Sequence, residues 1–240
     1  MADPLILVRS VHFAATLLVC GTVAFTVLVV EPTGTKVQAR SFHHKPTTLT
    51  WLALAAAILS GAAWLVLLAS DILGASLVDV CLHGGAWPVL FDTRFGLVWC
   101  ARFALALLLG LLMLWPAART LQLAAAIALA ALPALIGHAG ATPGTAGEVH
   151  LVSDMVHLLA ASAWLGGLPA FVLLLWQARR TAEPAWYDFT IRATRRFSVV
   201  GILSVGALLA SGLINSWNLL SGPRDLVISD YGRLVALKIG

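Results

Sequence analysis

The sequence predicts an all-α protein, a polytopic bundle of transmembrane helices. Of its 240 residues, 60% are apolar and only 11% are Asp, Glu, Lys or Arg, whereas ordinary soluble proteins are about 25% charged. The mean hydropathy is +0.93. A chain this poor in charge cannot cover a water-exposed surface with polar groups, so most of it is expected to lie in lipid. These observations exclude a soluble protein.

Six apolar segments are long enough to cross a bilayer, which takes about 20 residues of helix. They are residues 5–30, 49–70, 95–115, 121–138, 149–176 and 197–220. The first is longer than the apolar region of a signal peptide, about 7–15 residues, so we expect a retained helix. Residues 231–240 begin a seventh apolar segment that is too short to span, and we expect either that the parent protein continues beyond Gly240 or that this end docks as a half-helix. Residues 1–240 are predicted to form one membrane domain.

The distribution of Lys and Arg predicts that the amino terminus is periplasmic. Positive residues favour cytoplasmic loops, and they concentrate in the first, third and fifth loops: Lys36, Arg40, Lys45, Arg119, Arg179, Arg180, Arg192, Arg195 and Arg196. The other loops contain only Arg94, Arg224 and the borderline Arg233. The net charge of +4 is therefore interpreted as a signal for membrane orientation, with no nucleic-acid partner.

The fifth segment carries ionisable residues at helical spacing. His150, Asp154 and His157 fall within about 60° of one another on a helix of 100° per residue, so they share one face. Ionisable groups inside a membrane must face protein, water or a ligand. Imidazole is a common metal ligand, and a carboxylate can bind the metal or orient an imidazole. This pattern favours metal or proton handling, with structural pairing between Asp154 and a histidine as the alternative.

Other polar residues extend this prediction. With the amino terminus outside, five of the seven histidines fall near the outer leaflet: His12, His83, His138, His150 and His157. Their convergence would build a metal site, with His83 the weakest candidate. Arg102 is interpreted as structural, pairing with Asp92, snorkelling to the interface or binding helix-end carbonyls. Pro133, Pro169 and the Gly166-Gly167 pair predict helices that are interrupted or closely packed.

Several short motifs resemble the copper resistance protein D (CopD) family of bacterial inner-membrane proteins. The resemblance covers about residues 130–240 and is carried by the following stretches: Gly137-His138-Ala139, Asp154 with His157, Trp164 with Gly166-Gly167, Arg195-Arg196-Phe197-Ser198, and Asp230-Tyr231-Gly232-Arg233 with Lys238. Weaker likeness surrounds Arg9 and His12. The resemblance implies copper homeostasis in the inner membrane, a periplasmic copper-binding partner similar to CopC, and no catalytic reaction. Family members usually have more spans than this chain.

The sequence therefore predicts a copper transporter rather than an enzyme, one that moves copper from the periplasm across the inner membrane. The metal ligands are expected to be His138, His150, Asp154 and His157, together with His12. Histidine with carboxylate suits Cu(II), but imidazole also binds Cu(I), so the oxidation state stays open. Two alternatives remain. One is a membrane cytochrome of the b type, whose haem would bind between His138 and His157 or between His12 and His157. The other is a non-transporting anchor or sensor that docks a periplasmic partner.

Overall fold

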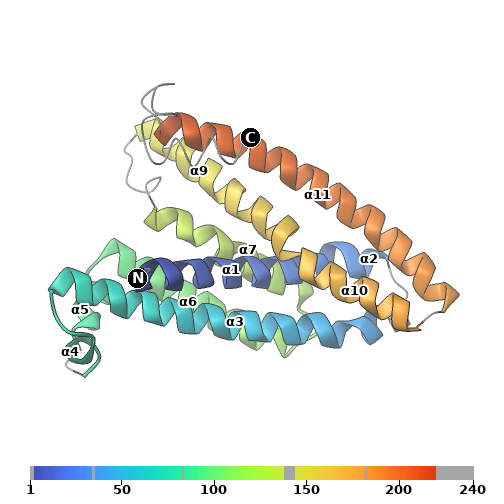
Figure 1. The fold of residues 1–240 in the computed structure, drawn as a ribbon, viewed down its shortest axis with the longest axis horizontal. Coiled ribbons are helices and arrows are strands. Elements are labelled where there is room, and N and C mark those ends of the chain that lie inside the picture. The colour runs from blue at the N-terminus through green and yellow to red at the C-terminus, as the bar shows by residue number, and fades with distance from the viewer. Residues whose placement is uncertain (1–2, 34–35, 83, 138–143, 182, 220–240) are drawn as a thin grey trace.

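The computed structural model describes residues 3–33, 36–82, 84–137, 144–181 and 183–219. This part of the chain is helical and contains no strand, and it includes six helices long and apolar enough to cross a membrane. The predicted fold class, a polytopic helical bundle, is confirmed (Figure 1). His138 and the short segment 231–240 lie outside the described residues.

The six candidate spans are built from uninterrupted and interrupted helices. The first comprises α1 (Pro4–Phe25), the π-helix η1 (Thr26–Val30) and α2 (Glu31–Thr33), and the second lies in α3 (Lys36–Leu73). The third is α6 (Arg94–Met113), and the fourth is α7 (Arg119–Ala131) with the 3-10 helix η2 (Leu132–Ile136). The fifth comprises α9 (Gly144–Ala161), the π-helix η3 (Ser162–Gly166) and α10 (Leu168–Thr181), and the sixth is α11 (Pro184–Leu219). Two short helices, α4 (Leu77–Leu82) and α5 (Ala86–Phe91), connect α3 to α6.

Local sequence explains where several of these helices begin and where two of the spans are interrupted. Asp3 accepts a hydrogen bond from the Leu5 amide at the start of α1, and Thr93 does the same for the Gly96 amide at the start of α6. Such caps satisfy amides that have no partner inside the helix. Pro133 lies in the 3-10 helix that ends the fourth span, and Pro169 follows the π-helix of the fifth. Proline has no amide hydrogen to donate, so both predicted interruptions occur.

The helices extend further than the predicted apolar segments. The sixth helix begins at Pro184 rather than at residue 197, and the second begins at Lys36 rather than at residue 49. Arg192 and Arg195 are therefore helical residues and not part of a loop. The difference has a simple cause, because hydropathy marks only the part of a helix that lies in lipid, whereas Lys and Arg are good helix formers outside it.

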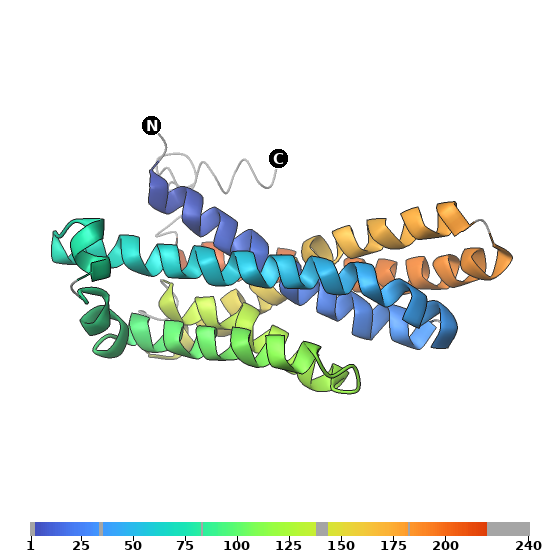
Figure 2. The same ribbon diagram turned by 90° about the horizontal axis from the view of Figure 1, so that it is seen from below.

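The first span lies in the middle of the bundle and contacts α3, α7 and η3. Figure 2 shows α1 crossing α3 at an angle. The closest approach joins Gly21 of α1 to Gly166 and Gly167 of the fifth span: a Cβ atom added to Gly21 would collide with their backbone atoms. Small residues permit this kind of backbone contact between transmembrane helices. The π-helix η3 is thus held directly against the centre of α1.

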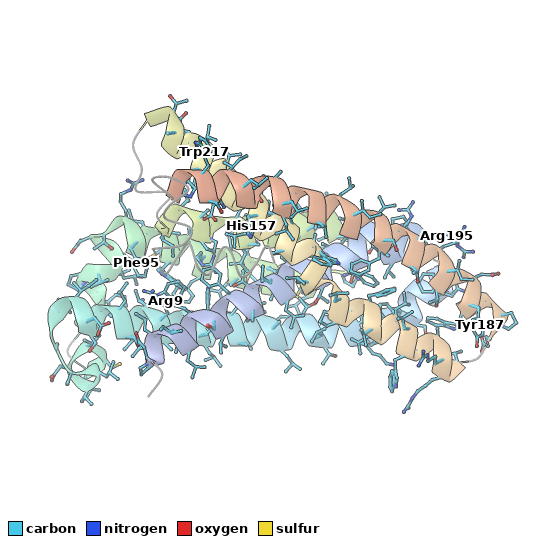
Figure 3. The ribbon with its side chains drawn as sticks, turned by 45° about the horizontal axis from the view of Figure 1, so that its top comes forward. Arg9, Phe95, His157, Tyr187, Arg195 and Trp217 are labelled. Atoms are coloured by element: carbon cyan, nitrogen blue, oxygen red, sulfur yellow. The ribbon has the colours of Figure 1, made fainter. Side chains whose placement is uncertain are left out.

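The two ends of the bundle differ in charge. Helices α1, α6 and α9 begin at one end, called here the N-terminal end, where α11 also finishes (Figure 1). The opposite end holds the basic residues of α10 and α11, and Figure 3 shows Arg195 far from Arg9. There Arg119 forms a salt bridge of 3.0 Å with Glu31, and Arg180 and Lys45 both pack on the Trp176 ring. The following ionisable residues lie in the N-terminal half of the bundle: Arg9, His12, Arg102, His150, Asp154 and His157.

Candidate functional site

The predicted stripe on α9 packs against α11, which contributes small polar side chains. Nδ1 of His157 lies 3.0 Å from the hydroxyl oxygen of Ser211. That hydroxyl donates its own hydrogen to the carbonyl of Ala207 at 2.6 Å, so it accepts from the imidazole. Because the proton of the neutral ring is then on Nδ1, its lone pair is on Nε2. Ser153 donates to the Ser211 carbonyl at 3.1 Å and ties the two helices together.

Asp154 is half-buried on the same face of α9. Its Oδ1 atom lies 3.5 Å from the amide nitrogen of Asn215 on α11, a long contact for a hydrogen bond. The carboxylate also interacts electrostatically with His150 and His157, as the predicted stripe requires. A Cβ atom placed on Gly137 would lie 3.9 Å from Oδ2 of Asp154. The carboxylate therefore lies where the fourth and fifth spans meet α11.

Asn215 contributes a buried oxygen without a hydrogen-bond donor to this region. Its Oδ1 atom is buried and has no hydrogen-bond partner among the described residues. Together with the Asp154 carboxylate, the Asn215 oxygen makes the region rich in acceptors. An unsatisfied buried acceptor is costly, and a cation is the kind of ligand that would satisfy it. We call Asp154, His157, Ser211 and Asn215 the acceptor cluster.

His150 is 4% exposed and opens the stripe near the N-terminal end. Within the part of the chain that the structure describes, no three His, Cys, Asp or Glu side chains lie close enough together to hold a metal ion. Residue 137 adjoins Asp154, and the next residue, His138, lies outside the described residues. The α9 stripe thus brings His150, Asp154 and His157 onto one face without assembling a closed coordination sphere.

His12 lies in a different environment, between α1, α3 and α6. Its Nδ1 atom is 3.0 Å from the Ala57 carbonyl and its Nε2 atom is 2.6 Å from a terminal nitrogen of Arg102. The carbonyl can only accept and the guanidinium can only donate, so Nδ1 carries the proton and Nε2 accepts. Both ring nitrogens are engaged. The structure therefore groups His12 with Arg102 and not with the α9 stripe.

Arg102 is 2% exposed and is held by three neighbours in addition to the Trp99 ring. Besides His12, it donates to the Leu129 carbonyl at 2.8 Å and to the Thr16 hydroxyl at 3.3 Å. The Leu129 carbonyl needs an outside donor because residue 133, four positions along, is a proline without an amide hydrogen. Of the roles predicted for Arg102, binding a helix-end carbonyl is the one observed.

Sequence reasoning missed one feature of the acceptor cluster. Asn215 is a polar residue within the sixth predicted segment and Ser211 lies four residues before it, but the sequence pattern was not interpreted as a pair. That spacing places both on one face of α11. Serine is common at transmembrane helix contacts, so the pair carried a weak signal. Only the packing of α11 on α9 identifies Ser211 as the partner of His157.

Comparisons with known proteins give two family matches and two relatives. The description "Copper resistance protein D-like, N-terminal domain" matches residues 1–148, and "Copper resistance protein D" matches residues 191–240. The inner membrane protein YebZ of Escherichia coli K12 is 28% identical over 235 residues, which cover 97% of this chain and 77% of YebZ. The copper transport protein CutJ of Bacillus subtilis 168 is 31% identical over 179 residues, which cover 65% of this chain and 32% of CutJ. No solved structure matches the chain.

Proposed function

The chain belongs to the copper resistance protein D family, and from this premise we propose that it carries copper ions across the inner membrane through the acceptor cluster between α9 and α11. It is a multi-pass inner-membrane protein of a copper-related family. The names of the relatives describe membrane location and transport rather than a reaction, in agreement with the expectation that the chain is not an enzyme.

The observation that carries this proposal is the chemistry of the atoms gathered around Asp154. They comprise a carboxylate, the unsatisfied Asn215 carbonyl oxygen and the His157 imidazole, which interacts electrostatically with that carboxylate. Nitrogen and oxygen donors of this kind bind copper. The region around Arg102 has the opposite character, because a buried guanidinium repels a cation. Electrostatics therefore favours the α9–α11 side of the bundle for copper.

Each residue of the proposed site has a distinct role. His150, near the N-terminal end, and His138, which lies outside the described residues, would capture the ion. His157, two turns deeper than His150, would accept it through Nε2, while Asp154 offsets the positive charge. Ser211 is a positioning residue that holds the His157 tautomer by accepting from Nδ1. Because no three His, Cys, Asp or Glu side chains of the described residues could together hold a metal ion, binding would require rotation of these side chains toward the ion.

The family resemblance and the charge distribution support the proposed direction of transport and the proposed partner. The basic end of the bundle would face the cytoplasm, which puts the acceptor cluster in the periplasmic half. Copper would then enter from the periplasm, delivered by a small copper-binding protein similar to CopC. The exposed start of α9, at residues 144–146, lies at the end where such a partner would dock.

Copper binding by the purified protein tests the site. We expect about one equivalent of copper per chain in the wild type and its loss in His157→Ala and Asp154→Asn. His44→Ala is the matched control, because His44 is exposed at the beginning of α3, at the opposite end. Copper retained by both site variants would refute the site, and wild-type protein without copper would refute the function.

Two further measurements separate transport from the alternatives. Copper uptake into vesicles should fall in His157→Ala, whereas a docking or sensing protein would retain copper-dependent growth in that variant. An absorbance spectrum after reduction tests for haem, which would give a Soret band. The structure offers no support for His12 as an axial haem ligand, because both of its ring nitrogens are hydrogen-bonded.

A further inference from the structure

A second polar cluster in the N-terminal half of the bundle has no place in copper binding. It consists of Arg9 and His12 from α1, Trp64 from α3, and Trp99 and Arg102 from α6, and we call it the donor cluster. The two indole rings pack edge to face with centroids 5.3 Å apart, and the His12 ring contacts both. Arg9 lies over Trp64 at 5.0 Å and Arg102 lies over Trp99 at 5.3 Å. Figure 3 shows Arg9 at the end of the bundle where Phe95 lies.

This cluster is crowded with hydrogen-bond donors that have no acceptor. Six buried side-chain nitrogen or oxygen atoms lack a partner among the described residues, and four of them belong here: Nε of Arg9, Nε1 of Trp64, Nε1 of Trp99 and Nε of Arg102. All four can only donate. The local acceptors are already used, since the His12 Nε2 atom and the Leu129 carbonyl both bind Arg102.

The charge of the cluster is also uncompensated. No carboxylate among the described residues forms a salt bridge with Arg9 or Arg102. Guanidinium groups stay protonated in proteins, so the cluster holds two positive charges. Buried charges in proteins are normally paired, and this holds more strongly inside a membrane. Cation–π contacts with the two indoles offset part of this cost but supply no acceptor for the unpaired N–H groups.

We propose that the donor cluster binds an anion that accepts hydrogen bonds from the indole and guanidinium N–H groups. The chemistry required is a negative charge with several acceptor lone pairs, which an inorganic anion or the phosphate group of a membrane lipid provides. Arg and Trp N–H groups suit such ligands because a charge-assisted hydrogen bond is about twice as strong as a neutral one. The site is separate from the acceptor cluster and does not rest on copper transport.

The donor cluster lies a short distance from the N-terminal end of the bundle. Arg9 follows the start of α1 by five residues and Arg102 follows the start of α6 by eight, which at 1.5 Å per residue places them roughly 8–12 Å from that end of the bundle. Arg9 is half-buried, so the cluster borders the surface at that position. An anion from the adjoining aqueous phase, or a lipid phosphate at the interface, lies within reach.

Thermal unfolding in lipid-free detergent tests the proposal. The buffer contains gluconate as the starting anion, and chloride, inorganic phosphate or phosphatidylglycerol is added in separate titrations. We expect a saturable rise in Tm with at least one of these ligands, because a ligand that binds the folded state stabilises it. Trp99→Phe keeps an aromatic ring but removes one donor, and it should weaken the apparent affinity about tenfold or more. Trp217→Phe is the matched control, because Trp217 is 87% exposed on α11.

Each outcome decides the question. A rise in Tm that chloride or phosphate produces, and that is weakened in Trp99→Phe, supports an inorganic anion as the ligand. A rise in Tm that only phosphatidylglycerol produces, and that is weakened in the same variant, supports a lipid phosphate. The proposal is overturned if none of the ligands produces a saturable rise in Tm. It is also overturned if the apparent ligand affinity is the same in Trp99→Phe and Trp217→Phe. If Trp99→Phe does not fold, Trp64→Phe provides the same comparison. Copper binding is measured in parallel and should be unchanged in Trp99→Phe.

Discussion

Removing the Ser211 hydroxyl should weaken copper binding although Ser211 is not a proposed ligand. Its oxygen accepts the His157 Nδ1 proton at 3.0 Å and donates to the Ala207 carbonyl at 2.6 Å. In Ser211→Ala the imidazole loses the contact that fixes its orientation and tautomer, so Nε2 is no longer held ready for the metal. Loss of such an orienting partner typically lowers metal affinity about 10–100-fold, which corresponds to about 1.4–2.8 kcal/mol of binding free energy.

The assay is a competition titration of copper against a chromophoric chelator, at one pH and in one detergent. Ser204→Ala is the matched control, because Ser204 is also buried in α11 and lies two turns before Ser211. Ser211→Thr retains a hydroxyl and should recover most of the affinity. A Ser211→Ala protein with wild-type affinity, alongside a His157→Ala protein that has lost its copper, would show that the hydrogen bond does not position the ligand.

Three other predictions concern pH, packing and surface charge. Copper affinity should fall as the pH is lowered from 7.5 to 5, because protonation of an imidazole ligand removes the lone pair that binds the metal; an unchanged dissociation constant would exclude histidine ligands. Gly21→Ala should lower the free energy of unfolding by about 1–3 kcal/mol because the added methyl collides with the backbone of η3. Gly206→Ala is the control, because open space surrounds Gly206, and this change should be neutral or slightly stabilising. Equal Tm values for the two variants would contradict the close helix contact. Glu31→Gln breaks the Arg119 salt bridge of 3.0 Å, but both side chains are partly exposed, so chemical denaturation should show a loss below about 1 kcal/mol.

The two polar clusters explain how one small bundle can contain opposite charges in the same half of the membrane. The Asp154 region offers acceptors and the Arg102 region offers donors, and different helices build each. The central span carries Arg9 and His12 of the donor cluster, and it is held against η3 of the fifth span through Gly21 and Gly166. Separation of the clusters would allow the proposed copper ion to bind beside α11 without approaching the buried guanidinium.

The sequence by itself determined the spans and the composition of the α9 stripe. Hydropathy is a local property of about 20 residues, so six spans could be counted without knowing their neighbours. Helical periodicity is equally local, and it correctly put His150, Asp154 and His157 on one face. The interruptions at Pro133 and Pro169 also followed from chemistry within a single residue.

Only the tertiary structure decided which polar residues meet. The outer histidines were expected to converge, but His12 faces Arg102 and Ala57, while His157 faces Ser211. In lipid, apolar helix faces are solvated almost equally well in many arrangements, so an apolar pattern does not select a neighbour. Specific contacts such as the Gly21 crossing and the Leu129 carbonyl exposed by Pro133 select it instead. Those contacts join residues far apart in the chain, and local periodicity does not contain them.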